Sequence, residues 1–205
     1  MTGLRIVVAD DESEMRDFFE KVLPRFGHKV VAVAENGTQL VEHCRQLQPD
    51  LVISDIKMSE LDGIEACTSI CNERPVPVIL VSAYHDPALI ARAENDHVLA
   101  YLVKPIGIAD LQPAISIATR RFAEFQKLRK ECDDLKQALN DRKVIERAKG
   151  MLMRLAHLDE KEAFQRLQDY ASERSQKLVE AANCLLSVEK ALSPSGSSSK
   201  KPHAH

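Results

Sequence analysis

Four polar residues with the chemistry of phosphoryl transfer stand at the ends of separate short apolar runs. Asp10, with Asp11 beside it, follows the first run, Asp55 ends a second, Ser82 ends a third, and Lys104 follows a fourth. Two carboxylates about 4 Å apart repel by roughly 4 kcal/mol at an effective dielectric near 20, so a site that gathers them requires a cation. Oxygen ligands suit Mg²⁺. In such a site Asp55 is a candidate nucleophile toward phosphorus, with Lys104 and Ser82 binding the phosphoryl oxygens.

The apolar runs themselves indicate a fold that brings these residues together. They are β-branched, nearly continuous, and separated by amphipathic stretches of helical period, as in strands buried on both faces of a parallel sheet. The expected strands cover residues 4–9, 30–33, 51–53, 76–81 and 99–103, and the expected helices 15–26, 38–47, 64–71 and 87–94. This alternation predicts a doubly wound α/β domain with a five-stranded parallel sheet, whose carboxyl edge collects ligands.

Acidic residues at strand ends have a second explanation, because they also cap helices. For Asp11, which Glu14 follows three residues later, capping explains the residue equally well. The complete set, with Ser82 and Lys104, favours the metal and phosphate site.

Residues 4–120 resemble the receiver domain of response regulators, with a flavodoxin-like fold. The resemblance rests on Asp10-Asp11-Glu12, Asp55, Met58, Asp62-Gly63, Ser82-Ala83 and Lys104-Pro105. It implies that a sensor histidine kinase phosphorylates Asp55, that a backbone carbonyl at Lys57 joins Asp10, Asp11 and Asp55 around Mg²⁺, and that the bond before Pro105 is cis. It also implies that Tyr101 acts with Ser82 as a switch. Ser59 stands where the family usually has proline, which loosens the loop after Asp55.

The sequence beyond residue 107 is helical throughout. Phe125, Leu128, Cys132, Leu135 and Leu139 alternate steps of three and four, which is the seam of a coiled coil. Arg142 takes the next seam position, and the apolar series then resumes with a changed step, which rotates the apolar face.

A small helical bundle is expected to follow the coil. The first helix breaks at 156–158, and Asp159 with Glu162 forms a capping box before a second helix that extends to about Glu173. A third helix covers about 176–191. We expect a receiver at 1–120, a coiled-coil linker at 121–142, a three-helix domain at 143–192, and a disordered Ser- and Lys-rich tail at 193–205.

Residues 130–192 resemble the ANTAR domain of transcription antitermination regulators. The resemblance rests on Ala148-Lys149-Gly150, Leu152-Met153, Ala163-Phe164, Leu167, Ala171 and Ala181-Ala182. It implies a transcription antiterminator that captures paired stem-loops in leader RNA. It also implies a homodimer joined through the coil, and the adjoining receiver suggests that phosphorylation controls its assembly.

The residues of this domain divide into packing and binding candidates. Ala148, Gly150, Ala163 and Ala171 are small enough for close helix approach, although glycine costs about 1 kcal/mol relative to alanine in a helix, and Phe164 is expected to fill the bundle centre. The candidate RNA contacts are Arg142, Lys143, Arg147, Lys149, Arg154, Tyr170 and Arg174. Tyr170 is an equally good candidate for the bundle core.

Composition and charge limit the classes of protein to which this chain can belong. Residues 1–119 carry a net charge of −8 and residues 120–205 carry +5, which indicates two domains with different partners. The scattered cysteines indicate a reducing cytoplasm, and no run is long enough to cross a membrane. We expect no enzyme beyond the phosphorylation and dephosphorylation of Asp55, and no small-molecule substrate beyond phosphodonors. Two alternatives stay open: a DNA-binding response regulator and a phosphorylation-switched protein-interaction module.

Overall fold

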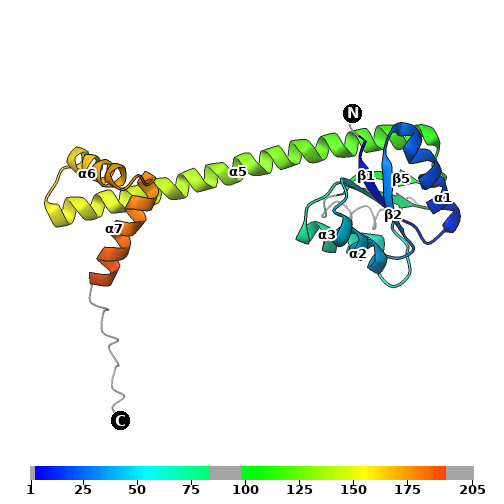
Figure 1. The fold of residues 1–205 in the computed structure, drawn as a ribbon, viewed down its shortest axis with the longest axis horizontal. Coiled ribbons are helices and arrows are strands. Elements are labelled where there is room, and N and C mark those ends of the chain that lie inside the picture. Colours follow the sequence, from blue (N-terminus) through cyan, green and yellow to red (C-terminus); the bar gives the residue numbers. More distant parts are fainter. Residues whose placement is uncertain (1–2, 84–97, 193–205) are drawn as a thin grey trace, which may run out of the picture. The chain divides into compact units, whose positions relative to one another are not determined.

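A computed structural model describes residues 3–83 and 98–192 of the chain, and Figure 1 shows the course of the elements. Clustering of backbone contacts divides the chain into two units, residues 1–128 and 129–205. The expected helix at 87–94 and the expected disordered tail at 193–205 lie outside the described residues.

The first unit contains a five-stranded parallel sheet in the order β2-β1-β3-β4-β5, which confirms the predicted fold class. The strands are β1 (Arg5–Ala9), β2 (Lys29–Ala34), β3 (Leu51–Asp55), β4 (Val78–Ser82) and β5 (Val98–Val103). The helices of this unit are α1 (Ser13–Val22), α2 (Gly37–Leu47), α3 (Gly63–Glu73) and the first part of α5 (Ile108–Ala156), with a 3₁₀ turn η1 (Leu23–Phe26) after α1. Pro24 lies in that turn, which explains why α1 ends before the expected residue 26.

Both faces of the sheet are covered by helices, as the continuous apolar strands predicted. On one face Val7, Val52 and Leu80 pack in a cluster with residues of α2 and α3. On the other face Ile6, Val8 and Ile53 pack in a cluster with residues of α1 and α5. The alternation of adjacent strand residues between the two clusters follows from the two-residue period of a strand.

The helix α5 is longer than any element that the sequence suggested, with 49 residues in one uninterrupted helix. Its first turns pack on the sheet through Leu111, Ile115 and Ala118. The expected linker and the first helix of the bundle are therefore parts of one element. The structure describes no helix long and apolar enough to serve as a membrane span.

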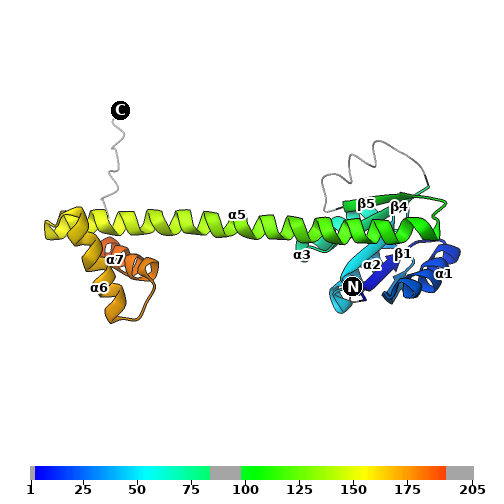
Figure 2. The same ribbon diagram turned by 90° about the horizontal axis from the view of Figure 1, so that it is seen from above.

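The second unit packs the last third of α5 with α6 (Glu160–Glu173) and α7 (Leu178–Leu192) (Figure 2). The predicted capping box is present: the Asp159 side chain accepts from the Glu162 N–H at 2.8 Å, and the Glu162 side chain accepts from the Asp159 N–H at 2.9 Å. The core of this bundle consists of Leu167 and buried alanines, namely Ala148, Ala171, Ala181 and Ala182.

Candidate functional site

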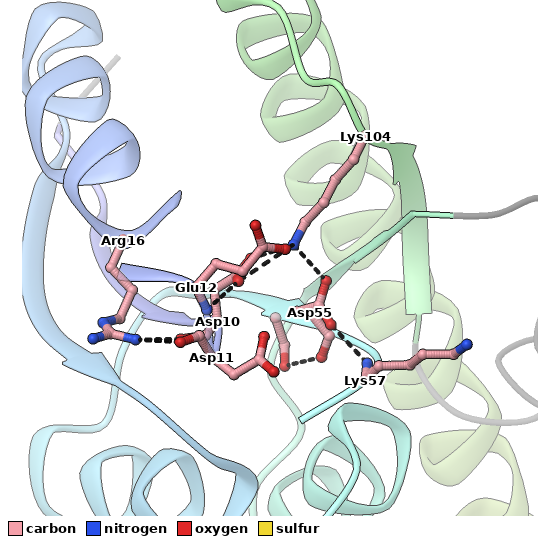
Figure 3. Close-up of polar contacts among 8 residues, drawn as sticks. Asp10, Asp11, Glu12, Arg16, Asp55, Lys57 and Lys104 are labelled. Atoms are coloured by element: carbon pink, nitrogen blue, oxygen red, sulfur yellow. Dashed lines mark hydrogen bonds and ion pairs between the residues drawn. The ribbon is translucent and has the colours of Figure 1, made fainter. Parts of the chain in front are cut away.

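Four strand ends meet at the carboxyl edge of the sheet (Figure 3). Asp10 directly follows β1, Asp55 ends β3, Ser82 ends β4 and Lys104 directly follows β5. Asp10 is fully buried, and Asp55 and Ser82 are only 5% and 3% exposed. Parallel strands place their carboxyl ends on one edge, which is why residues far apart in sequence gather here.

The ammonium of Lys104 joins three carboxylates. Its Nζ atom lies 3.0 Å from Asp55 Oδ1, 3.1 Å from Asp10 Oδ2 and 2.8 Å from Glu12 Oε1. One lysine therefore links the ends of β1, β3 and β5. The Lys104–Pro105 peptide bond is cis, as predicted.

Backbone amides hold the two buried aspartates in position. The Lys57 N–H donates to Asp55 Oδ2 at 2.7 Å, and the Glu12 N–H donates to Asp10 Oδ1 at 3.0 Å. Each bond closes a short turn from a carboxylate to the amide two residues later. The Asp55 Oδ1 atom thus faces Lys104, while its Oδ2 atom is fixed by the loop that follows β3.

Gly63, at the start of α3, packs directly against the backbone of Asp55. A Cβ at this position would lie 1.9 Å from the Asp55 carbonyl oxygen and 2.9 Å from Ser54 Oγ. The Gly63 N–H also donates to the Ile56 carbonyl at 2.9 Å. The absence of a side chain at Gly63 therefore lets α3 begin beside the candidate phosphoacceptor.

Burial dominates the electrostatics of the site. Desolvation raises the pKa of Asp10 and of Asp55 above that of an ordinary aspartate, and the hydrogen bonds to Lys104 oppose this rise only in part. For Lys104, burial lowers the pKa, but the hydrogen bonds to Glu12, Asp55 and Asp10 outweigh it, so the pKa is raised and the lysine is charged at neutral pH. The site combines clustered acids, whose ionised forms need a cation, with one fixed positive charge.

The carboxylates fit a hard divalent cation. Ligand atoms of Asp10, Asp11 and Glu12 lie within 4.8 Å of one another. Asp10 Oδ2 is buried and accepts no hydrogen bond from the described residues, although the Lys104 ammonium is close to it. Asp10, Glu12 and Asp55 share the single ammonium of Lys104, which leaves their cluster with a net negative charge, and oxygen ligands are those that Mg²⁺ prefers.

Two residues at this edge were missed as contributors from sequence. Glu12 is the nearest partner of Lys104, and Arg16 donates to the carbonyls of Asp10 and Asp11 at 2.9 and 3.0 Å. Arg16 also pairs with Glu35 at 2.9 Å, which ties α1 to the segment after β2. The position of Arg16, one helical turn after the acidic residues 10–12, is the feature of the sequence that could have indicated this contact.

The two expected switch residues lie on neighbouring strands. Ser82 is buried at the end of β4, and the Lys104 N–H donates to the Ser82 carbonyl at 2.8 Å. Tyr101 pairs in register with Leu80 on β4 and is half-buried against the α2 and α3 face. Ser82 is therefore on the strand next to the Asp55 strand, and Tyr101 is one strand further out, on the edge strand β5.

The second unit carries the candidate RNA-binding residues on α5 and at the end of α6. Arg142, Lys143 and Arg147 are exposed and form no ion pair with another described residue. Arg154 pairs with Glu189 at 3.0 Å, and Arg174 lies over the Tyr170 ring at 4.0 Å from its centre. Tyr170 is half-buried and packs against the bundle core, so it contributes to packing.

The structure places Lys149 differently from the expectation of a phosphate contact. Lys149 is only 7% exposed, and its Nζ atom lies 2.8 Å from Glu160 and 3.1 Å from Glu146. Hydrogen bonds to these two carboxylates raise its pKa. Because its charge is already bound to α6, Lys149 connects two helices instead of facing solvent.

Phe164 was expected in the bundle centre, and this prediction is wrong. Its side chain is 37% exposed and lies at the surface, with the Lys149 ammonium 5.7 Å from the ring centre. The neighbouring α6 positions Ala163 and Leu167 are fully buried instead. The rotation of α6 relative to α5 and α7 decides this, because it turns Leu167 toward the buried alanines, where partly buried residues of α5 and α7 complete the packing.

The packing role expected for Gly150 is also wrong, whereas the alanines pack as expected. Ala148 and Ala163 are fully buried and Ala171 is 5% exposed. A Cβ at Gly150 would meet only the Arg154 Nη1 atom, at an ordinary contact distance of 3.8 Å. Among the described residues, no neighbouring helix comes within 4 Å of that Cβ position.

Both halves of the chain match known protein families. Residues 6–116 match the response regulator receiver domain, and residues 133–186 match the ANTAR domain. The transcriptional regulatory protein PdtaR of Mycobacterium tuberculosis is 37% identical over 182 residues, which cover 89% of each chain. A methylesterase/glutaminase of Carboxydothermus hydrogenoformans is 33% identical over 115 residues, but these are 55% of this chain and 32% of that protein.

Solved structures share the fold of the first unit. The receiver domain of the response regulator NarL from Mycobacterium tuberculosis has a TM-score of 0.55 and 25% identity, covering 58% of this chain and 98% of that one. The receiver domain of RcsB from Salmonella enterica, with a TM-score of 0.52 and 22% identity, covers 56% of this chain and 87% of that one. Its identity is low enough that it supports the fold alone.

Proposed function

Because this chain belongs to the response regulators that join a receiver domain to an ANTAR domain, we propose that it is a phosphorylation-controlled, RNA-binding transcription antiterminator. In this account a sensor histidine kinase phosphorylates Asp55, and the helical unit binds paired stem-loops in leader RNA. Capture of these stem-loops prevents a terminator hairpin from forming.

The phosphoryl transfer follows from the site geometry. An Asp55 carboxylate oxygen attacks phosphorus, the bond from phosphorus to the donor nitrogen or oxygen breaks, and the leaving group takes its electron pair. Lys104 provides a fixed positive charge for the phosphoryl oxygens, and the Ser82 hydroxyl provides a donor. Asp10, Asp11, Asp55 and the Lys57 carbonyl would hold Mg²⁺, which when bound neutralises the charge of the incoming phosphate.

A single observation carries this part of the proposal: Lys104 bridges Asp10 and Asp55 at about 3 Å, although the three residues are far apart in sequence. We expect Asp55→Asn to abolish labelling of the protein by radioactive acetyl phosphate in the presence of Mg²⁺. Asp50→Asn, at an exposed position before β3, is the matched control and should label normally. Labelling that persists in Asp55→Asn would show that another residue accepts the phosphoryl group.

RNA is favoured over duplex DNA by the start of α6, the helix that would have to enter a DNA groove. Its first turn carries Glu160 and Glu162, and its cap is Asp159. A recognition helix needs polar and basic residues in its first turns, so this acidic end would face phosphate unfavourably. Filter binding with leader RNA hairpins and matched duplex DNA should show preferential RNA binding. Preferential duplex binding would favour the DNA-binding alternative, and binding to neither by the phosphorylated protein would favour a protein-interaction module.

We propose that α5 also provides the dimer contact. The seam residues Phe125, Leu128, Leu135 and Leu139 are 44 to 67% exposed, and Cys132 between them is exposed too. A row of exposed apolar side chains at heptad spacing is stabilised by pairing with an identical helix. The division into receiver 1–120, coil 121–142 and ANTAR domain 143–192 places this row in the coil.

Catalysis of other reactions forms no part of the proposed function. Receiver domains also occur in enzymes, as in the methylesterase/glutaminase of Carboxydothermus hydrogenoformans, but the similarity to that protein covers the receiver part of this chain only. The output of this chain is the ANTAR domain. We propose that its chemistry is limited to phosphorylation and dephosphorylation of Asp55.

A further inference from the structure

Gly150 has no structural reason to be glycine. It lies inside α5, where glycine is the least favourable residue after proline. At Gly37 and Gly63 a Cβ would lie 2.3 and 1.9 Å from a backbone oxygen, so packing requires glycine there. At Gly150 the nearest atom to a built Cβ is the end of the flexible Arg154 side chain, at 3.8 Å. The fold would accept alanine at this position.

The surroundings of Gly150 are basic. Lys143, Arg147, Gly150 and Arg154 follow one another in steps of four, three and four, so they share one face of the helix. The bundle core uses other positions of the same helix, with Ala148 buried and Ile145 and Leu152 packed against it. The glycine is therefore a gap in the middle of a positively charged strip, which we define as Lys143, Arg147, Gly150 and Arg154.

We propose that the RNA backbone binds directly against the α5 main chain at Gly150, between the flanking cations of this strip. This rests on the proposed RNA-binding function and names its contact surface. Removing a side chain from a helix face lets a sugar–phosphate backbone approach closely, and the cations on both sides attract its phosphates. Lys143 and Arg147 are free of ion pairs to other described residues, and Arg154 pairs only with Glu189, so the strip keeps a net positive charge.

A protein partner fits this strip less well than RNA. The strip has no apolar side chain of its own, whereas the centre of a protein interface is typically apolar and poor in charged residues. The exposed apolar row at heptad spacing is the seam at 125–139, outside the strip, and the exposed apolar residues near the strip are Met153 and Leu155. The glycine gap and the charges are thus separate from the surface proposed for dimerisation.

The test compares the affinity and thermal stability of full-length variants. Gly150→Ala and Gly150→Leu add a small and a large side chain without changing charge. Arg147→Gln removes one cation from the strip. Asn183→Ala, at an exposed position of α7 outside the strip, is the control for improved helix propensity. Each protein is titrated with a leader RNA hairpin at three or more salt concentrations, and its Tm is measured alongside.

We expect Gly150→Ala to raise the Tm of the helical unit by a few degrees, as Asn183→Ala does, and yet to weaken RNA binding about tenfold. Gly150→Leu should weaken it further. The salt dependence should keep its slope in both variants, because no charge is lost. Arg147→Gln should reduce the slope by about one.

The outcomes separate this inference from the proposed function. If the wild-type protein binds no hairpin, the proposed function fails and the inference fails with it. If the wild type binds and Gly150→Ala binds equally well, the inference alone is overturned. A fall in the Tm of Gly150→Ala would also overturn it, because the glycine would then serve packing. Unchanged RNA affinity with altered sedimentation would assign the strip to a protein contact and overturn it likewise.

Discussion

Lys104 and Lys149 both pair with several carboxylates, but Lys104 lies at the proposed phosphorylation site and Lys149 lies between two packed helices. Lys104 joins Asp10, Asp55 and Glu12, two of which are buried and belong to the proposed phosphorylation site. Lys149 joins Glu146 and Glu160, which are more than half exposed and belong to two packed helices. We therefore expect removal of Lys104 to affect the proposed phosphorylation of Asp55, and removal of Lys149 to affect helix packing.

The change Lys149→Ala should destabilise the helical unit without reducing the number of RNA phosphate contacts. Its loss leaves two carboxylates without a cation and removes the ring contact with Phe164. We expect a lower Tm and an unchanged slope of RNA affinity against salt, measured by calorimetry and filter binding. Lys143→Ala, at an exposed site, should leave the Tm unchanged and reduce the slope of RNA affinity against salt. If Lys149→Ala reduced the slope of RNA affinity against salt and left the Tm normal, Lys149 would be a phosphate contact, as the sequence had suggested.

The Lys149–Glu160 pair also gives the helical unit a defined pH dependence. Lys149 lowers the pKa of Glu160 below that of an ordinary glutamate, so the unfolded chain binds a proton more readily than the folded one. The stabilisation is therefore complete above pH 4.5, the usual value, and is lost as the pH falls through the lowered pKa. Acid titration of helix content should show Glu160→Gln losing stability less steeply below pH 4.5 than the wild type. Parallel titration curves for the wild type and Glu160→Gln would exclude the Lys149–Glu160 pair as a source of the pH dependence.

Sequence reasoning located the residues of the first site better than those of the second. Asp10, Asp55 and Lys104 could be placed because the carboxyl ends of parallel strands share an edge, whatever the details of packing. Lys149 and Phe164 were misplaced because their exposure depends on how α6 is rotated against α5. Phe164 lies at the edge of the single apolar face of that helix, so a modest rotation, which its sequence alone did not determine, decides whether the ring is buried.

At the scale of elements, the start of α3 controls the position of Asp55, the proposed phosphoacceptor. A Cβ at residue 63 would overlap the Asp55 carbonyl oxygen, so Gly63→Ala forces the β3–α3 connection to move. We expect a loss of about 2 kcal/mol in the free energy of unfolding of the receiver, and slower labelling by acetyl phosphate. Gly150→Ala, which makes no such contact, is the matched control for the loss of a glycine. Normal stability and labelling in Gly63→Ala would mean that the loop adapts without moving Asp55.

The helix α5 was predicted as separate pieces because its pattern changes along its length. Its apolar stripe packs on the sheet at Leu111, is exposed from Phe125 to Leu139, and is buried again at Ala148. The first and last parts pack on different elements, and we propose a second copy of the helix as the partner of the middle part, so the heptad step breaks near Arg142 where the bundle begins. Pro113 stands near the start of α5, and no glycine or proline follows it until Gly150, so the helix continues as one element through these parts.

The exposed middle of α5 should support self-association. Replacing Leu128 and Leu135 with glutamate puts two charges into the proposed seam, and we expect the dimer dissociation constant to rise at least tenfold in sedimentation equilibrium. The control pair Lys130→Gln and Gln137→Glu changes the net charge equally on the opposite side of the helix. If both double variants raised the dimer dissociation constant equally, the change in net charge, and not the seam, would explain the weaker dimer.

On the scale of the whole molecule, the charges of the two halves fit their proposed partners. The receiver part is acidic and presents a site for a divalent cation and a phosphodonor, while the rest of the chain is basic and carries an ANTAR domain. α5 contributes residues to both units, so in the proposed dimer we expect a change in the self-association of α5 to act on the ANTAR domains as well. This supports phosphorylation control of RNA binding through one continuous helix.

The affinity for a leader RNA hairpin, measured with and without acetyl phosphate and Mg²⁺, tests that coupling most directly. We predict that phosphorylation tightens RNA binding by the wild-type protein and leaves Asp55→Asn unchanged, with paired stem-loops bound more tightly than a single one. Equal wild-type affinity in both states, with Asp55 shown to be phosphorylated, would contradict the account.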